Sequence, residues 1–269
     1  MKSPVLTNQD KPIPASLTHE TVLSVHHWTD KLFSFRISRP QAFRFRSGEF
    51  VMLGLFAEGV PLLRAYSMTS PSWDDTLEFY SIKVPHGPLT SQLQHIKPGD
   101  KLLLGKKATG TLSLDSLTPS KSLYLFSTGT GFAPFASLIR DPETYDKFER
   151  VILTHTCRAV DELAFGKSIL TALKTDPLVG ELTNNCLLYF DSVTQEPYRR
   201  VGRITKFIEN ETLSNIIGQP PISQNSTRAM ICGSIEMTQD MSTVLKKLGL
   251  SAGSAAKPAD FVVERAFVD

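Results

Sequence analysis

The hydrophobic pattern of this chain changes near residue 120, and the change limits the folds that the sequence can adopt. From Glu20 to about Leu114, short runs of alternating apolar residues are separated by proline, glycine and aspartate. The runs predict strands at residues 21–25, 32–37, 50–55, 77–84 and 101–104. A helix-like stretch at residues 89–96 interrupts them. We therefore expect the first half to form a small antiparallel β-barrel with one capping helix.

Beyond residue 120, strand-like and helix-like segments alternate. The strand-like runs lie at residues 122–127, 151–156, 187–190, 229–232 and 261–264. The helix-like stretches lie near residues 133–140, 161–175, 203–217 and 236–247. This βα repetition is typical of an α/β fold with a doubly wound parallel sheet. A polar, proline-containing link at residues 117–120 predicts two domains, residues 1–117 and residues 118–269.

Glycines mark the passage from the first strand of the second half to its first helix, in the run Thr-Gly-Thr-Gly-Phe-Ala-Pro at residues 128–134. At such a helix N-terminus, free backbone N–H groups and the positive end of the helix dipole favour a bound phosphate. Glycines also serve tight turns that bind nothing, so this run alone leaves the nature of the site open.

The composition excludes several classes of protein. The chain has 29 basic and 27 acidic residues among 269, with no basic cluster interleaved with aromatics, so it carries no nucleic-acid signature. Cys157, Cys186 and Cys232 are odd in number and widely spaced, which argues against a disulfide framework, a zinc site and an iron–sulfur cluster. Hydrophobic residues make up 41% of the chain, enough for a sizeable core.

No segment predicts export or insertion into a membrane. Residues 1–18 lack the apolar core of a signal peptide. The most apolar window, residues 50–63, is short and contains Glu58. We expect a cytoplasmic monomer that binds no membrane.

A second group of functional residues, Arg-Ala-Tyr-Ser at residues 64–67, ends a strand-like region of the first half. In an extended segment Arg64 and Tyr66 share one face, so a guanidinium for phosphate and a ring for stacking reach the same ligand. Residues 80–84 offer backbone groups, and the turn at residues 87–91 opens a helix where a second phosphate fits. Taken singly, these groups match a surface arginine beside a packed tyrosine, and an ordinary strand, turn and helix.

Taken together and in this order, these residues closely resemble the ferredoxin–NADP reductase superfamily, and most closely its bacterial flavodoxin/ferredoxin–NADP reductases. In that family a motif of arginine, any residue, tyrosine and serine binds the flavin, and a glycine-threonine-glycine turn receives the nicotinamide dinucleotide. The resemblance also rests on residues 27–30, 43–50, 87–91, 128–135, 232–234 and 263–268. It covers nearly the whole chain from about residue 20.

The resemblance implies that the first domain binds FAD. Arg64 would bind the pyrophosphate, Tyr66 would stack on the isoalloxazine ring, and Ser67 would place its hydroxyl near the flavin nitrogen that receives hydride. Such groups tune the electronics of the cofactor, while the cofactor itself carries the reaction. The other implied FAD contacts in this domain are Ala65, Ser81, Ile82, Lys83, Val84, Gly87, Leu89, Thr90 and Ser91.

For the second domain the resemblance implies an NADP site. The implied contacts are Thr128, Gly129, Thr130, Gly131, Pro134, Arg158, Arg203, Cys232 and Gly233. An arginine after the second strand suits a 2′-phosphate, whereas an acidic residue suits a dinucleotide without it. The arginines after the strands therefore predict a preference for NADP, and the resemblance implies Arg158 and Arg203 as the partners of the 2′-phosphate. The acidic residues Asp161 and Glu162 would instead suit a dinucleotide without the 2′-phosphate, and surface arginines are commonly only solvated.

Cys232 and Glu264 complete, with Tyr66 and Ser67, the catalytic set that the resemblance implies. Both would lie beside the nicotinamide, where Cys232 would shape the geometry of hydride transfer and not act as a nucleophile. A buried cysteine otherwise packs as a small apolar residue. Glu264, in a final strand, could equally be a solvated edge residue.

The C-terminal tail departs from the pattern of the plant-type relatives. Ala266 stands where those relatives carry an aromatic residue that covers the flavin, so access of the nicotinamide is expected to be gated differently. Phe267 is implied to pack on the adenine of a bent FAD. The sequence stops at Asp269, so a longer tail is not expected.

Two further patterns in the second half are discounted. Residues 166–168, Gly-Lys-Ser, end like a nucleotide triphosphate loop, but Asp161 stands where that motif needs glycine. His155 and Cys157 lie two apart on one strand face, as metal ligands can, but no third and fourth ligand is evident nearby. We expect a core or crevice role for this pair.

The predicted activity is that of an FAD enzyme that takes a hydride from NADPH and passes electrons singly to ferredoxin or flavodoxin. The carrier is expected to be a separate protein, because the cysteines of a ferredoxin module are missing. Candidate docking residues for an acidic carrier are Arg44, Arg46, Lys83, Lys106 and Lys107. Two alternatives stay open: a reductase of the same fold for free flavin, a quinone or an oxygenase component, and a flavin-binding redox sensor without turnover.

Overall fold

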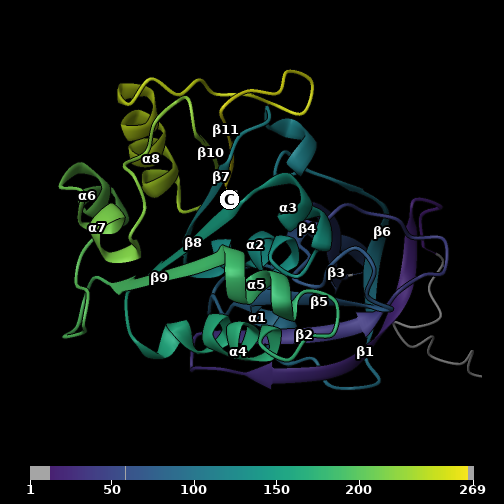
Figure 1. Cartoon of the computed structure of the whole chain (residues 1–269). Coiled ribbons are helices and arrows are strands. Elements are labelled where there is room, and N and C mark those ends of the chain that lie inside the picture. Colours follow the sequence, from purple (N-terminus) through teal and green to yellow (C-terminus); the bar gives the residue numbers. More distant parts are fainter. Residues whose placement is uncertain (1–12, 58, 266–269) are drawn as a thin grey trace, which may run out of the picture.

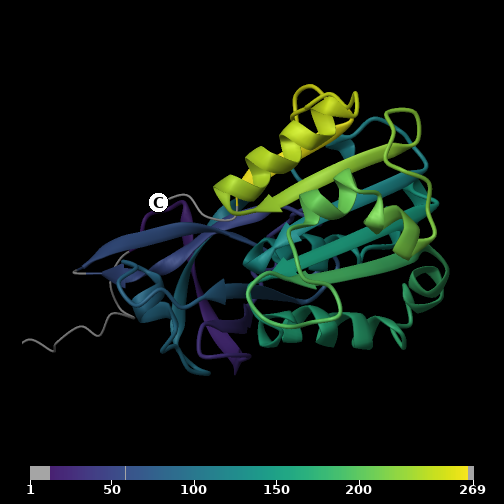
Figure 2. The same cartoon turned by 90° about the vertical axis from the view of Figure 1, so that its left-hand side faces the viewer.

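Two sheets account for the architecture (Figure 1). The computed structural model describes residues 13–57 and 59–265. The first sheet, here the antiparallel unit, has six strands in the order β4-β3-β6-β1-β2-β5. The second, here the parallel unit, has five strands in the order β11-β10-β7-β8-β9. Figure 2 shows the two units beside each other, with helices covering the parallel sheet.

The antiparallel unit holds the first six strands of the chain. They are β1 (Leu17–His27), β2 (Leu32–Ser38), β3 (Phe50–Ala57), β4 (Val60–Ser67), β5 (Thr76–Ile82) and β6 (Lys101–Thr109). Helix α1 (Thr90–Leu93) and the 3₁₀ turn η1 (Leu114–Ser116) accompany them. In its core the ring of Phe35 stacks between those of Phe33 and Phe79, at centroid distances of 5.7 and 5.4 Å. The predicted antiparallel barrel with one short helix is confirmed.

The parallel unit alternates strands and helices, as the sequence predicts. Its strands are β7 (Ser122–Thr128), β8 (Arg150–Cys157), β9 (Leu187–Val193), β10 (Thr227–Gly233) and β11 (Phe261–Arg265). Its helical elements are η2 (Gly129–Phe132), α2 (Ala133–Leu138), α3 (Pro142–Lys147), η3 (Asp161–Leu163), α4 (Ala164–Leu173), α5 (Gly180–Cys186), α6 (Ile204–Glu209), α7 (Thr212–Ile217) and α8 (Ile235–Lys247). The chain runs from β7 outward to β9 and then crosses back to β10, so the strand order reverses between β7 and β10. A doubly wound sheet binds its ligand at such a switch point.

The helices differ from the prediction in several places. The stretch at residues 203–217 is two helices, because Glu211 adopts a left-handed φ of 58° between α6 and α7. Helices α3 and α5 were not predicted; α3 begins where the Asp141 carboxylate accepts the N–H of Glu143 at 3.1 Å. The stretch at residues 89–96 forms only the four residues of α1.

A polar seam joins the two units beside the end of α2. The guanidinium of Arg140 donates to the Glu78 carboxylate at 3.2 Å. Next to it, the Asp141 carboxylate accepts hydrogen bonds from the hydroxyls of Ser47, at 2.6 Å, and Ser72, at 3.2 Å. Arg140 and Glu78 side chains are each 12% exposed. Because removing one partner of a buried pair is costly, the polar seam fixes how the units sit against each other.

Aromatic rings form a second contact between the units. Tyr80 of β5 stacks on Phe165 of α4 at 4.3 Å, and Trp28 meets the same ring edge-on at 5.4 Å. Phe132, at the end of the turn η2, lies edge-on to Phe165 at 6.1 Å. This cluster brings the end of β5 close to the turn that follows β7.

Candidate active site

The carboxyl ends of β7 and β10 press against each other at the switch point. A Cβ added to Gly131 would overlap the carbonyl oxygen of Cys232, and one added to Gly233 would overlap Oγ1 of Thr128. The same Thr128 oxygen accepts a hydrogen bond from the N–H of Ser234 at 3.3 Å. Only glycine permits backbone approaches this close. The predicted contacts 128, 131, 232 and 233 therefore lie against one another at the switch point.

The turn η2 is open on its outer side. Gly129 has a φ of 52°, a conformation that favours glycine, and a Cβ added to it would meet nothing within 4 Å. Helix α2 follows with Pro134 in its first turn, where a missing N–H costs nothing. The first N–H groups of a helical segment have no partner within it. The residues from Gly129 to Thr130 therefore fit a phosphate group of a dinucleotide.

Strand β4 carries the predicted flavin motif on the surface of the antiparallel unit. Arg64 is exposed, and its guanidinium donates to the neighbouring carbonyl of Leu63 at 2.9 Å. The ring of Tyr66 lies edge-on to Phe79 at 6.3 Å, and its hydroxyl is 3.3 Å from Oγ of Ser81. These contacts hold the tyrosine ring while leaving the strand accessible. The strand thus presents an exposed guanidinium and a partly buried ring on its accessible surface.

The turn between β5 and α1 is closed by its own hydrogen bonds. The hydroxyl of Thr90 donates to the carbonyl of Val84 at 3.3 Å, and the N–H of Ser91 donates to the carbonyl of Gly87 at 3.1 Å. Leu89, which is 2% exposed, anchors the turn in the core. A Cβ added to Gly87 would overlap the Thr90 hydroxyl. The predicted contacts Val84, Gly87, Leu89, Thr90 and Ser91 thus form one compact loop.

Cross-strand neighbours connect the end of β4 with the parallel unit. Ser67 pairs with Phe50 of β3, and Phe50 pairs with Thr109 at the end of β6. The next residue, Gly110, faces the last strand of the chain, since a Cβ on it would lie 3.1 Å from Oε2 of Glu264. The structure therefore brings Ser67 and Glu264 into one region, although 197 positions separate them in the sequence, from 67 to 264.

Thr111 holds the carboxylate of Glu264. Its N–H donates to Oε2 at 3.0 Å, and its hydroxyl donates to the Val263 carbonyl at 3.1 Å. Burial raises the pKa of Glu264 to about 7, against the lowering effect of the Thr111 hydrogen bonds. Cys232, the register partner of Glu264, is 1% exposed, and burial raises the pKa of its thiol well above the ordinary range. The carboxyl group therefore exchanges its proton near neutral pH, while the thiol stays protonated.

The two predicted phosphate-binding arginines have different surroundings. Arg158 is exposed directly after β8, and its backbone N–H donates to the Glu162 carboxylate at 2.9 Å. Arg203 precedes α6, and its guanidinium donates to Glu236 at 2.8 Å and lies 3.5 Å from Asp240, both on α8. A phosphate at Arg203 would compete with these carboxylates. Arg158 is the arginine better placed to bind an anion.

A buried carboxylate that the sequence did not single out organises the loop after β9. Asp191 is 0% exposed and accepts hydrogen bonds from Tyr198, Arg199 and Arg200, each at 2.6 Å. Burial acts to raise the pKa of Asp191, but these hydrogen bonds outweigh it and hold the pKa below its ordinary value. Arg199 and Arg200 therefore stabilise the loop. No short-range pattern in the sequence marks this cluster.

Three comparisons with known proteins bear on these sites. Residues 14–111 match the model of the oxidoreductase FAD-binding domain, and residues 125–243 match that of the oxidoreductase NAD-binding domain. A flavodoxin/ferredoxin–NADP reductase of Rhodobacter capsulatus is 51% identical over 265 residues, which cover 97% of this chain and 98% of that protein. The chain belongs to the ferredoxin–NADP reductase family.

Other members of the reductase family agree with this assignment. A ferredoxin–NADP reductase of Pseudomonas aeruginosa is 50% identical over 256 residues, 95% of this chain and 99% of that protein. The crystal structure of a ferredoxin–NADP reductase from Neisseria gonorrhoeae, with bound FAD and NADP, superposes with a TM-score of 0.85 at 31% identity. The superposition covers 94% of this chain and 100% of the Neisseria chain. The resemblance drawn from the sequence is confirmed.

The roles of single residues stay predictions. Ala266 and Phe267 lie outside the described residues. Ala65 is exposed on β4, and Ile82, at the end of β5, packs against the core of the parallel unit. Sequence reasoning missed Thr111, which nothing marks apart from its place after β6.

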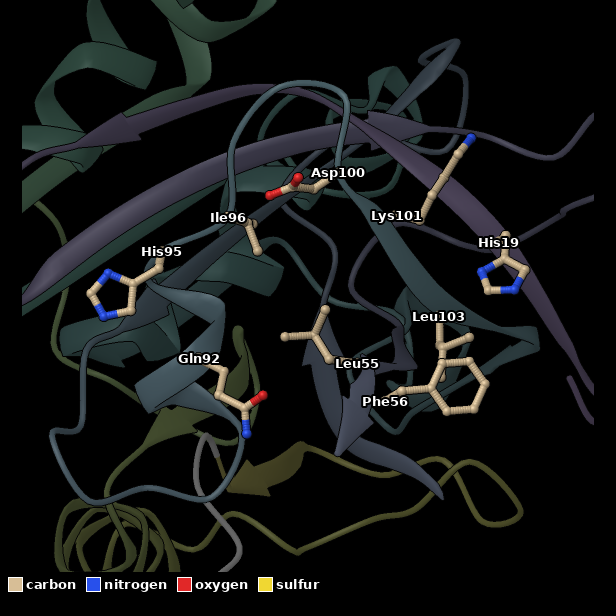
Figure 3. Close-up of a pocket in the computed structure, with 9 residues that line it drawn as sticks. All are labelled: His19, Leu55, Phe56, Gln92, His95, Ile96, Asp100, Lys101 and Leu103. Atoms are coloured by element: carbon tan, nitrogen blue, oxygen red, sulfur yellow. The ribbon is translucent and has the colours of Figure 1, made fainter. Parts of the chain in front are cut away.

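A cavity of about 310 Å³ lies elsewhere in the antiparallel unit (Figure 3). Figure 3 shows His19, Phe56 and Leu103 on one side of it and Gln92 and His95, from the region of α1, on the other. None of the predicted cofactor contacts lines it. Among the described residues, no three histidine, cysteine or acidic side chains gather as metal ligands would.

Proposed function

We propose that this protein is an FAD-dependent oxidoreductase that exchanges electrons between NADP(H) and a one-electron carrier protein, ferredoxin or flavodoxin. Bound FAD supplies the chemistry that links a hydride donor to a one-electron acceptor. The observation that supports the proposal best is the contiguity of the two sites: the end of β4 at Ser67 and the end of β10 at Cys232 meet at the Thr111–Glu264 contact.

On the flavin side, each residue of β4 has a separate role. Arg64 binds the FAD pyrophosphate, because its exposed guanidinium offers the paired donors that phosphate prefers. Tyr66 stacks on the isoalloxazine ring, and Phe79 and Ser81 fix its orientation. Ser67 places a hydroxyl beside the ring. The loop of residues 87–91 completes the pyrophosphate site.

On the nucleotide side, the turn and the two strand ends orient the donor. The N–H groups at Gly129 and Thr130 bind the NADP pyrophosphate. Cys232 gives the nicotinamide a small, uncharged wall, since its thiol stays protonated. Glu264, whose pKa is about 7, accepts or releases a proton near the site of hydride transfer, at the carboxyl oxygen that Thr111 does not hold.

The proposal is tested by mixing the FAD-loaded protein anaerobically with NADPH in a stopped-flow spectrometer. Fast loss of the oxidised flavin absorbance is expected. Tight FAD with no reduction by NADPH would favour a redox sensor instead. Turnover is then compared with purified ferredoxin, flavodoxin, free flavin and a quinone, and a preference for the small acceptors would contradict the role of a protein carrier.

The docking surface for an acidic carrier is proposed to centre on Lys106 and Lys107. Both are exposed on β6. The other candidates are partly engaged: Arg46 pairs with Asp115, and Nζ of Lys83 donates to the carbonyl of Thr29 at 2.8 Å. Arg44 donates to the Gln41 carbonyl at 2.7 Å. Reduction of the carrier should slow as salt rises, and a salt-independent rate would contradict this surface.

We place the boundary between the FAD-binding and NADP-binding domains at residues 117 and 118. In support, β6 ends at Thr109 and β7 begins at Ser122.

We also infer a cytoplasmic monomer, which cell fractionation and sedimentation test. In residues 13–57 and 59–265, no helix has the length and apolar character needed to span a membrane.

A further inference from the structure

His155 lies in the parallel sheet directly beneath the turn that follows β7. It pairs in register with Ser127 of β7 on one side and with Asp191 of β9 on the other. Its side chain is 0% exposed. Burial lowers the pKa of His155 to about 4, so the imidazole is neutral at physiological pH. The proposed reaction does not use this group.

The hydrogen bonds of His155 define which ring nitrogen carries the proton. Nε2 lies 3.1 Å from the carbonyl oxygen of Gly129 and 3.2 Å from Sγ of Cys157. A carbonyl oxygen only accepts, so Nε2 is the protonated nitrogen and donates to Gly129. Nδ1 is then unprotonated, and no donor in the described part of the chain reaches it.

Two neighbours hold the ring in this orientation. Phe132 stacks on it with a centroid distance of 4.6 Å and an interplanar angle of 30°. On the side of Nδ1, helix α4 comes so close that a Cβ on Gly166 would lie 3.0 Å from that nitrogen. Glycine destabilises a helix interior, so a glycine at position 166 needs a structural reason. The imidazole of His155 provides that reason, because a side chain on residue 166 would press against the ring. Since Gly129 begins the turn η2 and Phe132 ends it, His155 contacts both ends of the turn.

The hydrogen bond to Gly129 also determines where the next N–H points. In a trans peptide the carbonyl and the following N–H point in opposite directions. The Gly129 carbonyl faces the imidazole in the core, so the N–H of Thr130 faces away from the core. The surroundings of Gly129 are open as well, since a Cβ added to it would meet nothing within 4 Å.

We propose that His155 is a positioning residue for the dinucleotide: by fixing the Gly129 carbonyl, it aims the N–H of Thr130 at the pyrophosphate. The inference rests on the proposed NADP site. A neutral imidazole can do this without placing a charge in the core. Without the donor, the Gly129 carbonyl is held only by the backbone of the 3₁₀ turn, and the N–H of Thr130 is oriented less firmly toward the pyrophosphate.

The test compares His155→Leu, which removes the donor at similar size, with His155→Gln, which keeps an N–H near the position of Nε2. Thr154→Val is the matched control, since it removes a buried hydroxyl that donates to the Leu125 carbonyl at 3.3 Å and does not contact the turn. Each FAD-loaded protein is titrated with NADP⁺ and with 2′-AMP, which has no pyrophosphate. Calorimetry gives both affinities, and the flavin spectrum gives the FAD content.

His155→Leu should weaken NADP⁺ binding about tenfold, the effect of one hydrogen bond, and leave 2′-AMP binding and FAD content unchanged. The Michaelis constant for NADPH should rise by a similar factor, with a smaller change in kcat. His155→Gln should recover most of the affinity, and Thr154→Val should bind like the wild type. Equal NADP⁺ affinity in His155→Leu, or parallel losses of 2′-AMP and FAD in both His155 variants, would overturn the inference. A wild-type protein that binds no NADP⁺ would contradict the proposed function itself.

Discussion

The two proposed cofactor sites are built in opposite ways. The flavin strand β4 is a surface: Arg64 is exposed, and Leu62 and Tyr66 are partly buried. The nucleotide site is built on closely packed backbone, with glycine required at Gly131 and Gly233. A ligand on β4 buries apolar protein area, whereas a ligand at the nucleotide site meets donors that the backbone already orients. The comparison indicates a flavin that stabilises the fold and a nucleotide that exchanges freely.

Removing FAD should show this difference most strongly. FAD present at about 1,000 times its Kd stabilises the protein by about 4 kcal/mol, whereas NADP⁺ at about ten times its Kd adds about 1.4 kcal/mol. These energies correspond to a fall in Tm of about 10 °C on removal of FAD and a rise of about 4 °C with NADP⁺. Scanning calorimetry of the FAD-loaded, FAD-free and NADP⁺-saturated protein measures both. Equal changes in Tm for the two ligands would contradict the proposed difference between the two sites.

Gly131→Ala should damage the nucleotide site and spare the flavin strand. The added Cβ overlaps the Cys232 carbonyl, and we expect a loss of about 3 kcal/mol in the free energy of unfolding together with loss of NADP⁺ binding. Denaturant titration and binding assays on the FAD-loaded variant check this. Gly129 and Gly218 give matched controls for stability, because both have a left-handed φ with nothing within 4 Å of an added Cβ. Only Gly218 is also a control for binding, since Gly129 belongs to the proposed pyrophosphate site.

In those controls, Gly129→Ala and Gly218→Ala should each lose about 1 kcal/mol of stability. Gly218→Ala should bind NADP⁺ normally, since it lies at the end of α7. If Gly131→Ala behaves like Gly218→Ala, the nucleotide site is not shaped by that backbone contact.

Arg158→Ala should weaken NADPH binding by about 1.5–3 kcal/mol, the range for hydrogen bonds to a charged group. Binding of NADH, which lacks the 2′-phosphate, should hardly change, so the preference for NADPH falls. Arg150→Ala is the control, because Arg150 is exposed at the opposite end of the same strand. Steady-state kinetics with both nucleotides measure the preference. An unchanged ratio would remove Arg158 from the phosphate site.

Glu264→Gln should change the pH dependence of stability. The pKa of Glu264 rises from 4.5 to about 7 on folding, so the folded state binds its proton more tightly than the unfolded chain. The wild type therefore loses this contribution to stability as the pH rises through 7, and the variant does not. The variant should gain in Tm relative to the wild type between pH 5 and pH 8. A constant difference in Tm would show that Glu264 does not titrate in this range.

The fold could be predicted where the signals are local. Alternation of apolar residues and the βα rhythm distinguish the two units, because each pattern repeats within a few residues. The break between α6 and α7 could not be predicted, because it depends on the left-handed backbone conformation of Glu211. No short-range pattern in the sequence requires that conformation at this position. Likewise α5 carries mostly polar residues, and its end is defined by the start of β9.

The residues of the candidate site also fall into those that the sequence marks and those that it does not. Residues 64–67 and 128–131 lie in compact motifs, so the sequence alone marks them. The contact of Thr111 with Glu264 spans 153 positions, and that of His155 with Gly129 spans 26. Such pairs depend on which strands become neighbours. A single sequence cannot reveal them, because spacing along the chain carries no information about that register.

The polar seam at Arg140 and Asp141 has a consequence for exchanging parts between reductases. A chimera that joins this parallel unit to a foreign flavin-binding unit must also carry matching groups at Ser47, Ser72 and Glu78. Otherwise the graft buries a charge without a partner, at a cost of about 3–5 kcal/mol. The polar seam thus determines which flavin-binding units can be combined with this parallel unit, independently of either cofactor.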